Sequence, residues 1–309
     1  MNVRWEGVFP ALTTKFARNE ALDIPAMEKH FQLQIEAGVH GLVLLGSLGE
    51  NGTLTPEEKQ EIIRLAVSVS NGRIPVIAGV AETTTARACR FVEQAASNGA
   101  DGFMVLPPMQ YVSDGRETMA HLQSVAQSTD RTIMIYNNPV AYRVDVTPAM
   151  LAELADEPKF VALKESSDNV RRITDIRNLT GDRYKIFVGV DDLALESLLI
   201  GADGWVAGLV CAFPRETVAL YHLAKQRRLS EALALYRWFT PLLHLDADLK
   251  FVHYIKLAEA MAGVGTEAMR RPRLPLEGDE RDSVAAIIRK ALDSRPPLPQ
   301  ISLTAPTRA

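Results

Sequence analysis

The sequence predicts a (β/α)8 barrel followed by a C-terminal helical extension. The first observation is that short apolar, strand-like segments alternate with longer segments of helical period, eight times in succession. The second is that the connections between them are too short to hold a second sheet. The third is length, since 309 residues are enough for one large barrel-type domain or two smaller ones. Eight consecutive strand-then-helix units favour a closed barrel over a doubly wound sheet.

Each expected element has its own local signal. The strands are short apolar runs, at residues 7–12, 41–45, 75–80, 102–106, 132–136, 160–164, 185–188 and 204–207. The helices are amphipathic, and many follow an Asp, Ser or Thr suited to capping; they lie at residues 24–37, 56–70, 84–97, 116–128, 148–155, 170–179, 193–200 and 215–225. Gly38, Gly99 and Gly201 stand where a glycine would end the helix before the next strand.

The chain continues after the eighth unit. We expect a catalytic barrel over residues 1–225 and a helical extension over residues 226–309, with helices at 230–243, 249–262 and 279–292. Pro272, Pro275 and the run Pro296-Pro297-Leu298-Pro299 interrupt this part of the chain. The residues after Pro299 are small and polar, which predicts a frayed tail.

Composition narrows the class of partner. A formal net charge of -4 and a pI near 5.9 give no reason to expect nucleic acid or a membrane surface, so a small molecule is the expected partner. Cys89 and Cys211 are far apart and the six histidines lack ligand spacing, so we expect neither a disulfide framework nor a metal site. Residues 1–6 lack the features of a signal peptide, and no apolar run reaches about 18 residues. A cytoplasmic location is expected.

Lys164 closes the sixth strand segment, after Phe160-Val161-Ala162-Leu163. Lysine is depleted in strands and is rarely buried without a partner. A desolvated lysine loses its proton more readily and becomes a nucleophile toward carbonyl carbon, which suggests Schiff-base chemistry. A lysine that only ends a strand and extends to water is an equally good interpretation of this segment taken alone.

Two further segments end at the same predicted rim. After the second strand, Gly46-Ser47-Leu48-Gly49 could point several backbone N–H groups at one carboxylate, although a tight turn also explains the glycines. After the fifth strand, Tyr136 could pass protons at the barrel mouth or could simply cap the core. Because the carboxyl ends of barrel strands meet at one face, the three segments together indicate an active site.

These residues resemble those of a known family. The motifs Gly46-Ser47-Leu48-Gly49-Glu50, Tyr136-Asn137-Asn138-Pro139, Leu163-Lys164-Glu165-Ser166 and Val188-Gly189-Val190-Asp191-Asp192 are similar to those of the dihydrodipicolinate synthase/N-acetylneuraminate lyase family. The resemblance covers about residues 5–292. It implies a barrel with a C-terminal helical bundle, a homotetramer built as a dimer of dimers, and a covalent lysine imine in place of any metal or organic cofactor.

The resemblance also implies roles for individual residues. Lys164 would form the imine, Tyr136 would relay protons, and Ser47 would bind the substrate's 2-oxo carboxylate with the N–H groups around Leu48. The remaining expected substrate-binding positions are Gly46, Gly49, Asn138, Gly189 and Val206. Tyr111 and Arg143 are also expected there, but they match no position of the family's motifs.

Three departures from the family pattern affect the expected reaction. Members that make dihydrodipicolinate carry an arginine two residues after the proline of the tyrosine motif, where this chain has Ala141, so a second carboxylate loses its partner unless Arg143 turns inward. Leu48 replaces a hydroxyl residue, which predicts a weakened proton relay. Met109-Gln110 replaces a tyrosine pair after the fourth strand, and Tyr111 is one position late for the relay across the dimer.

These departures favour one substrate over condensation of two. The closest resemblance is to the branch that acts on 1-pyrroline-4-hydroxy-2-carboxylate, so we expect a deaminase of hydroxyproline degradation that yields 2,5-dioxopentanoate and ammonia. The alternatives are a 2-keto-3-deoxy sugar acid aldolase or dehydratase, a 4-hydroxy-tetrahydrodipicolinate synthase, and a catalytically inactive ligand-binding barrel. Asp191 and Asp192 could touch substrate hydroxyls or cap the next helix, and Glu165 is expected to point away from Lys164.

Overall fold

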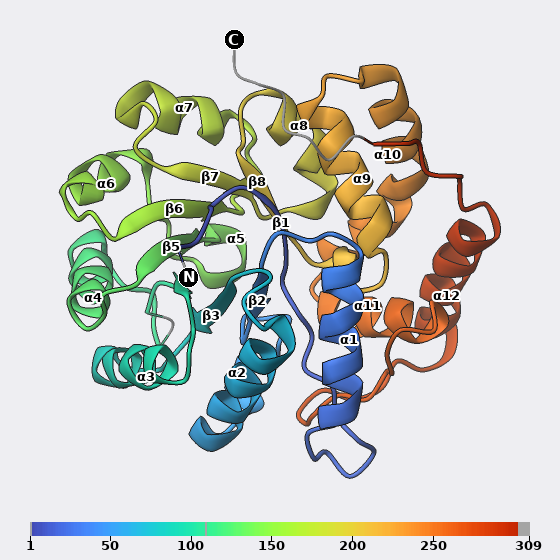
Figure 1. The fold of residues 1–309 in the computed structure, drawn as a ribbon, viewed down its shortest axis with the longest axis horizontal. Helices are drawn as coiled ribbons and strands as arrows, with labels where there is room; N and C mark the ends of the chain where they lie inside the picture. Colours follow the sequence, from blue (N-terminus) through green and yellow to red (C-terminus); the bar gives the residue numbers. More distant parts are fainter. Residues whose placement is uncertain (1, 109, 302–309) are drawn as a thin grey trace.

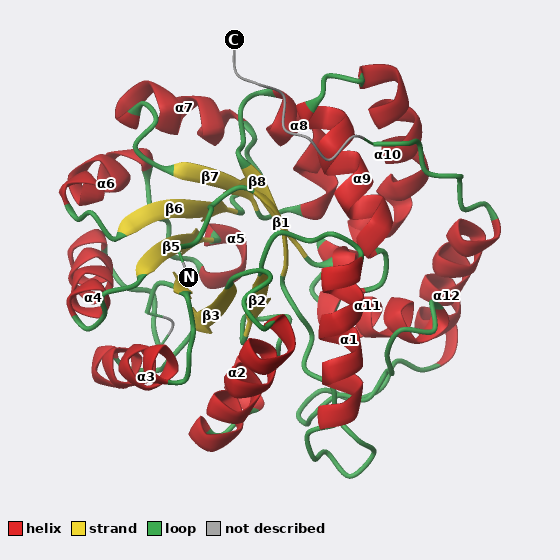
Figure 2. Ribbon diagram, viewed as in Figure 1, coloured by secondary structure: helices red, strands yellow, loops and turns green. Residues whose placement is uncertain are grey.

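The computed structural model describes residues 2–108 and 110–301. In this part of the chain, eight parallel strands form one sheet (Figures 1 and 2). The strands are β1 Gly7–Pro10, β2 Leu42–Leu44, β3 Val76–Val80, β4 Gly102–Val105, β5 Thr132–Asn137, β6 Phe160–Glu165, β7 Lys185–Val188 and β8 Gly204–Ala207. The predicted frayed tail after Pro299 lies, from residue 302 on, outside the described residues.

The sheet closes into a barrel. Its strands pair in the order β1-β8-β7-β6-β5-β4-β3-β2, and a parallel bridge between Ala11 and Val43 joins the two ends. The Leu12 N–H donates to the Val43 carbonyl at 2.9 Å, and the His40 N–H donates to the Val8 carbonyl at 2.8 Å. The predicted fold class is therefore confirmed, and closure removes the exposed sheet edges.

Helices surround the barrel, as Figure 2 shows. The α-helices are α1 Ile24–Glu36, α2 Pro56–Ser70, α3 Thr85–Ser97, α4 Gly115–Gln127, α5 Pro139–Tyr142, α6 Pro148–Glu153, α7 Arg171–Thr180, α8 Ala194–Leu199, α9 Pro214–Lys225, α10 Leu229–Leu243, α11 Phe251–Met261 and α12 Gly278–Asp293. Short 3-10 helices are η1 Asn51–Thr53, η2 Leu154–Asp156, η3 Asp191–Leu193, η4 Leu209–Cys211 and η5 His244–Asp246. Within the described residues, no helix is both long and apolar enough to cross a membrane.

Local signals placed nearly all these elements correctly. Every predicted strand and α-helix is present with each end within two residues of the prediction, except that the helix expected at 148–155 finishes as the 3-10 helix η2. The side chains of Asp23, Thr55, Thr84, Asp114 and Thr147 accept a hydrogen bond from the first turn of the helix that follows. Helix α5 was not predicted, because four residues are too few to show a helical period.

Aromatic side chains close the barrel at the N-terminal ends of its strands. Trp5 stacks on Phe9 with ring centroids 6.0 Å apart, and Phe9 meets Phe187 edge to face at 5.1 Å. The Trp5 indole N–H donates to the Thr132 hydroxyl at 3.1 Å. Chemistry is therefore confined to the opposite mouth, where the strands end.

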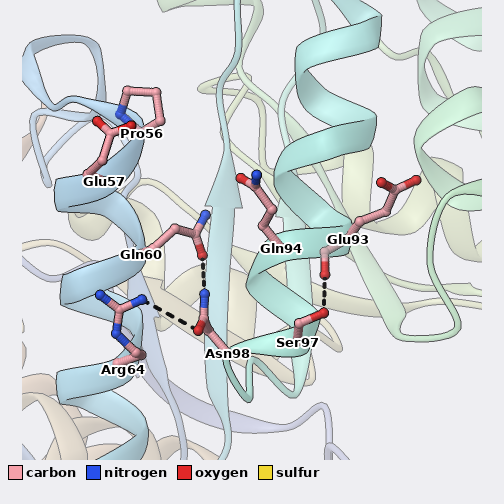
Figure 3. A pocket seen from close by; sticks show the side chains of 8 residues that line it. All are labelled: Pro56, Glu57, Gln60, Arg64, Glu93, Gln94, Ser97 and Asn98. Atoms are coloured by element: carbon pink, nitrogen blue, oxygen red, sulfur yellow. Dashed lines mark hydrogen bonds between the residues drawn. The ribbon is translucent and has the colours of Figure 1, made fainter.

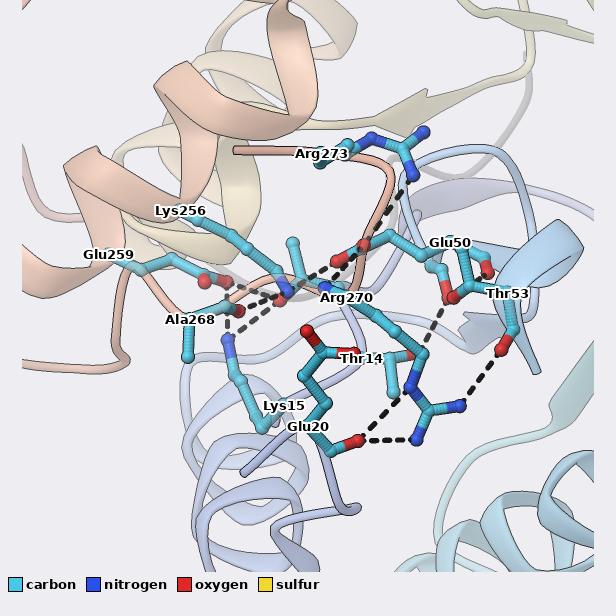
Figure 4. Close-up of polar contacts among 12 residues, drawn as sticks. Thr14, Lys15, Glu20, Glu50, Thr53, Lys256, Glu259, Ala268, Arg270 and Arg273 are labelled. Carbon is cyan, nitrogen blue, oxygen red and sulfur yellow. Dashed lines mark hydrogen bonds and ion pairs between the residues drawn. The ribbon is translucent and has the colours of Figure 1, made fainter. Parts of the chain in front are cut away.

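In the C-terminal extension, α10 packs against α9, Glu259 of α11 lies 3.5 Å from His30 of α1, and buried ion pairs tie the extension to the barrel (Figures 1 and 4). Lys256 of α11 lies 2.5 Å from Glu50, and both side chains are fully buried. Lys15 lies 2.6 Å from Glu259. Because Glu50 belongs to the glycine-rich turn after β2, this extension fixes one wall of the predicted site.

Candidate active site

Strand pairing turns the predicted residues toward the barrel interior. Tyr136 on β5 pairs with Lys164 on β6, which pairs with Phe187 on β7 and through it with Gly204 on β8. Paired residues of neighbouring strands face the same side, and alternate residues along a strand do so as well. Tyr136, Lys164 and Val206 therefore all face inward, near the ends of β5, β6 and β8.

Lys164 is buried, with 6% of its surface exposed. Its Nζ lies 4.2 Å from the centre of the Tyr136 ring. Burial lowers the pKa of Lys164, while the negative charge of Asp246, followed by Tyr142 and Asp191, acts in the opposite direction. The lowered pKa makes the neutral, nucleophilic amine accessible at lower pH than in a free lysine, which a lysine extending to water would not show.

Gly189 supports the Lys164 side chain from below. A Cβ at this position would lie 2.6 Å from Lys164 Cε, 2.7 Å from its Cγ and 2.1 Å from Ser166 Oγ. Only glycine fits in this position without displacing the lysine. This agrees with its predicted place on the pocket floor.

Tyr142 joins the site, although no role was predicted for it. Helix α5 begins after Asn138, whose side chain accepts from the Ala141 N–H at 2.9 Å, and ends at Tyr142. The Tyr142 hydroxyl hydrogen-bonds to Ser47, and its ring meets Tyr136 edge to face at 5.8 Å. Burial raises the pKa of Tyr142. Tyr142 therefore brings a hydroxyl to Ser47 from another segment of the chain, where Leu48 offers none.

The fifth strand contributes a second phenol. Burial raises the pKa of Tyr136, and Asn138 Nδ2 donates to its hydroxyl at 3.2 Å. Both phenols therefore keep their protons at neutral pH and can donate them. Asn138, predicted to bind substrate, has its two side-chain polar atoms engaged with Tyr136 and Ala141.

The glycine-rich turn is held from outside. Asn51 Nδ2 donates to the Leu45 carbonyl at 2.8 Å, and Thr14 donates to the Gly49 carbonyl at 2.6 Å. Among the described residues, the backbone N–H groups of Ser47 and Leu48 donate to no protein acceptor. They are free to bind an anion beside the Ser47 hydroxyl. Gly46 is buried in the same turn, and its position would tolerate a Cβ 3.5 Å from the Met104 methyl.

Two carboxyl groups lie near Lys164. Asp191 accepts from Trp205 Nε1 at 2.8 Å, the Leu209 N–H at 2.8 Å and the Gly208 N–H at 3.1 Å. It therefore organises the loop after β8, and neither it nor Asp192 caps α8. Burial raises the pKa of Asp191 to about 6. The second carboxyl, Asp246 of η5, comes from the C-terminal extension, and no sequence motif pointed to it.

Some predicted residues lie apart from this cluster. Arg143 is exposed, has a backbone φ of 60°, and makes no side-chain hydrogen bond or ion pair with Lys164 or Ser47 among the described residues. Tyr111 is 59% exposed and lies beside Glu117, which raises its pKa. Met109 is outside the described residues. Glu165 points away from Lys164, as predicted, and accepts from the Ser167 N–H at 2.8 Å.

A separate buried cluster contains groups that often bind metals. Ligand atoms of His30, Cys211 and Glu259 lie within 4.8 Å of one another. Lys15 Nζ already lies 2.6 Å from Glu259, however, and burial lowers the pKa of His30 to about 4. The fixed ammonium supplies the positive charge that this carboxylate needs. The cluster is best described as a structural ion pair.

A large hollow lies away from the predicted residues. A groove of about 520 Å³ runs between α2 and α3 on the outer wall of the barrel (Figure 3). Its lining is polar, with Asn98 donating to Gln60 at 2.8 Å. It contains none of the residues predicted for the site. In a (β/α)8 barrel, the active site is found at the carboxyl ends of the strands, whatever the size of other hollows.

A barrel with a buried, low-pKa lysine beside a phenol at the strand ends is the arrangement expected of a class I, Schiff-base-forming lyase. The sequence profile of the Dihydrodipicolinate synthetase family matches residues 4–291, and the chain belongs to this family. The resemblance found in the motifs is thereby confirmed, and the chain is an enzyme of this Schiff-base class.

Curated relatives and solved structures support the same family. The 4-hydroxy-tetrahydrodipicolinate synthase of Methanoculleus marisnigri is 32% identical over 288 residues, covering 92% of this chain and 98% of that protein. The synthase of Methanospirillum hungatei is 31% identical over 271 residues, covering 87% and 93%. The structure of dihydrodipicolinate synthase DapA-2 from Bacillus anthracis matches with a TM-score of 0.89 at 26% identity, covering 93% and 98%. YagE, a family member from E. coli K12 in complex with pyruvate, matches with a TM-score of 0.88 at 26% identity, covering 94% and 99%.

Proposed function

We propose that this enzyme acts on one small 2-oxo acid or its cyclic imine, and specifically that it is a 1-pyrroline-4-hydroxy-2-carboxylate deaminase. The observation that carries the proposal is the lack of an arginine at position 141, together with a phenol beside Ser47. Position 141 is an exposed alanine, and the next residue, Tyr142, places its hydroxyl on Ser47. A pocket without a cation for a second carboxylate suits one substrate better than condensation of two.

The proposed reaction starts with Lys164. Its amine attacks C2 of the ring imine, the bond between C2 and the ring nitrogen breaks, and a lysine imine forms with a free amine on C5. A proton leaves C3, and the resulting enamine expels the 4-hydroxyl as water. Tautomerisation moves the double bond to C5, and hydrolysis at C2 and C5 gives 2,5-dioxopentanoate, ammonia and free Lys164. One water is lost and two are consumed, so the net reaction takes up one water.

The surrounding residues have matching roles in this proposal. The Ser47 hydroxyl and the free N–H groups of Ser47 and Leu48 would bind the substrate carboxylate. Tyr136 and Tyr142 would exchange protons with the imine and the departing groups, because both hydroxyls lie in hydrogen-bonded positions next to Lys164 or Ser47. We propose that no metal or organic cofactor takes part, since the protonated imine is itself the electron sink.

A second candidate is 4-hydroxy-tetrahydrodipicolinate synthase. The names of the Methanoculleus and Methanospirillum relatives favour it, and the pyruvate complex of YagE supports binding of a 2-oxo acid in this fold. It would require Arg143 to turn from its exposed position toward the pocket. An aldolase or dehydratase for a 2-keto-3-deoxy sugar acid would use the same imine and enamine.

The test is borohydride trapping joined to product analysis. Pyruvate, a 2-keto-3-deoxy sugar acid and 1-pyrroline-4-hydroxy-2-carboxylate are each incubated with the protein, and adducts are located by peptide mass spectrometry. We expect labelling at Lys164 and stoichiometric ammonia from the cyclic imine. The Lys164→Ala variant should lose both, whereas Lys29→Ala, which changes an exposed lysine on α1, should behave as wild type. Turnover of pyruvate with aspartate semialdehyde and no ammonia from the imine would instead establish the synthase.

We also propose a cytoplasmic homotetramer built as a dimer of dimers. Exposed apolar side chains near the catalytic face, Tyr111, Val112 and Val140, are 59%, 59% and 63% exposed and would be covered by a second copy. Light scattering of the purified protein gives the mass directly, and a monomer would contradict this assembly.

A further inference from the structure

The C-terminal extension brings one carboxyl group to the barrel mouth. A Cβ at Gly208 would lie 2.1 Å from Asp246 Oδ1 and 2.7 Å from its Cγ, so the carboxyl rests directly on Gly208. Gly208 is the next inward-facing position after Gly204 and Val206 on β8. Asp246 therefore lies above Val206, which was predicted for the pocket floor.

The Lys164 side chain rests on a glycine in the same way, but next to the neighbouring strand. That glycine is Gly189, the first inward-facing position after β7. Val188 pairs with Trp205, so Gly208 is one strand across from Gly189 and two residues further along. With strands about 4.8 Å apart and about 3.3 Å per residue, the two glycines are about 8 Å apart.

Lys164 and Asp246 belong to the same end of the barrel but do not form an ion pair. Among the described residues, no ion pair of 4.0 Å or less joins Lys164 to a carboxylate. In its ionised form, Asp246 is nevertheless the charged group with the strongest effect on the pKa of Lys164. The amine and the carboxyl are therefore within electrostatic range of each other without being in direct contact as an ion pair.

Asp246 is also suited to hold a proton. Its side chain makes no hydrogen bond to another described residue, whereas Asp191 nearby is held by three N–H donors. Burial raises the pKa of Asp246 well above its usual range, Asp191 and Asp192 raise it further, and Lys164 opposes them. When two neighbouring carboxyls have such different environments, one is ionised and the other keeps its proton. Here Asp191 is the ionised one and Asp246 the protonated one.

We propose that Asp246 is the acid that protonates the hydroxyl expelled from C4 of the substrate. In this step the enamine nitrogen's electron pair forms the C2 imine, the C2–C3 double bond moves to C3–C4, and the C4–O bond breaks. The leaving oxygen takes the Asp246 proton and departs as water, and the carboxylate regains a proton from solvent. The inference rests on the proposed function only for the identity of the substrate, because any such dehydration needs this proton.

The experiment compares leaving groups that do and do not need a proton. Wild type and Asp246→Asn are each given 4-hydroxy-2-oxobutanoate or 4-chloro-2-oxobutanoate. For the first substrate, the unsaturated product of water elimination is measured; for the second, released chloride is measured. Exchange of the C3 protons of pyruvate with deuterium reports enamine formation alone. The matched control is Asp248→Asn, whose side chain is exposed and accepts from the Lys250 N–H at 2.8 Å.

We expect Asp246→Asn to slow hydroxyl expulsion by about 100-fold or more, within the range for a lost general acid. Chloride release and pyruvate exchange should stay within about threefold of wild type, because chloride leaves without a proton and enamine formation does not use Asp246. Asp248→Asn should match wild type in all three assays. If Asp246→Asn does not fold, Asp246→Ser provides the same comparison.

Three results would overturn the assignment. These are hydroxyl expulsion within threefold of wild type in Asp246→Asn, equal slowing of chloride and hydroxyl, and a wild type that expels chloride but never hydroxyl. The proposed deaminase function can be refuted without refuting the role of Asp246. If the cyclic imine releases no ammonia while Asp246 is still needed to expel hydroxyl from the open-chain acid, the deaminase proposal is wrong and the role of Asp246 stands.

Discussion

The contact between Gly189 and Lys164 allows a sharp test with a single methyl group. In Gly189→Ala the new Cβ would lie 2.6 Å from Lys164 Cε. Carbon atoms pack at about 3.5 Å or more, so the lysine tip must move by roughly 1 Å. A misplacement of about 1 Å can cost about 100-fold in rate, which corresponds to about 2.7 kcal/mol in the barrier.

The assay is the single-turnover rate of borohydride-trapped imine with pyruvate. We expect that rate to fall about 100-fold. Overpacking of this kind costs about 1–3 kcal/mol of folding free energy, less than the about 5–15 kcal/mol that stabilises a typical protein, so the variant should stay folded. Gly115→Ala is the control, because its Cβ would meet only Met150 at an ordinary 3.7 Å. Folded Gly189→Ala that traps pyruvate within threefold of wild type would refute the placement of Lys164 on this glycine.

Three further predictions test the surroundings of the site. Tyr142→Phe removes the hydroxyl on Ser47 and should lower kcat by about 100-fold with smaller loss of trapping, measured in steady state; an unchanged kcat would exclude Tyr142 from proton transfer. Lys256→Met removes the ammonium 2.5 Å from the buried Glu50, leaving Arg273 at 3.5 Å as its remaining cation, and should cost about 3–5 kcal/mol in urea unfolding; the double variant with Glu50→Gln should lose less than the sum of the single changes, and additive losses would contradict a coupled pair. Arg143→Ala should leave ammonia release within about threefold of wild type, because Arg143 is exposed and away from Lys164; a large loss would show that Arg143 turns into the site during the reaction.

The barrel could be predicted because its signals are local. Apolar periodicity, capping side chains and helix-ending glycines each act within a few residues, and they placed the strands and longer helices within two residues. Lys164, Tyr136 and Ser47 could be grouped from their positions in the sequence because strand ends in a barrel share one face. The sequence motifs also indicated the family that the sequence profile confirms.

Other parts of the site had no such signal. Helix α5 has four residues, and its position alone brings Tyr142 to Ser47. Glu50 stood out as part of a motif, but its partner Lys256 is distant in sequence. Asp246 lies in an extension whose approach to the barrel mouth no local pattern predicts.

By itself, the sequence determined the barrel, the reactive lysine and the residues at the strand ends, because each depends on short-range periodicity or on the geometry that all barrels share. Only the tertiary structure decided that Tyr142 supplies the hydroxyl beside Ser47 and that Asp246 lies near Lys164. Those positions depend on how a short helix and the C-terminal extension pack against the barrel. Such packing is set by contacts between residues far apart in the chain, which no local pattern encodes.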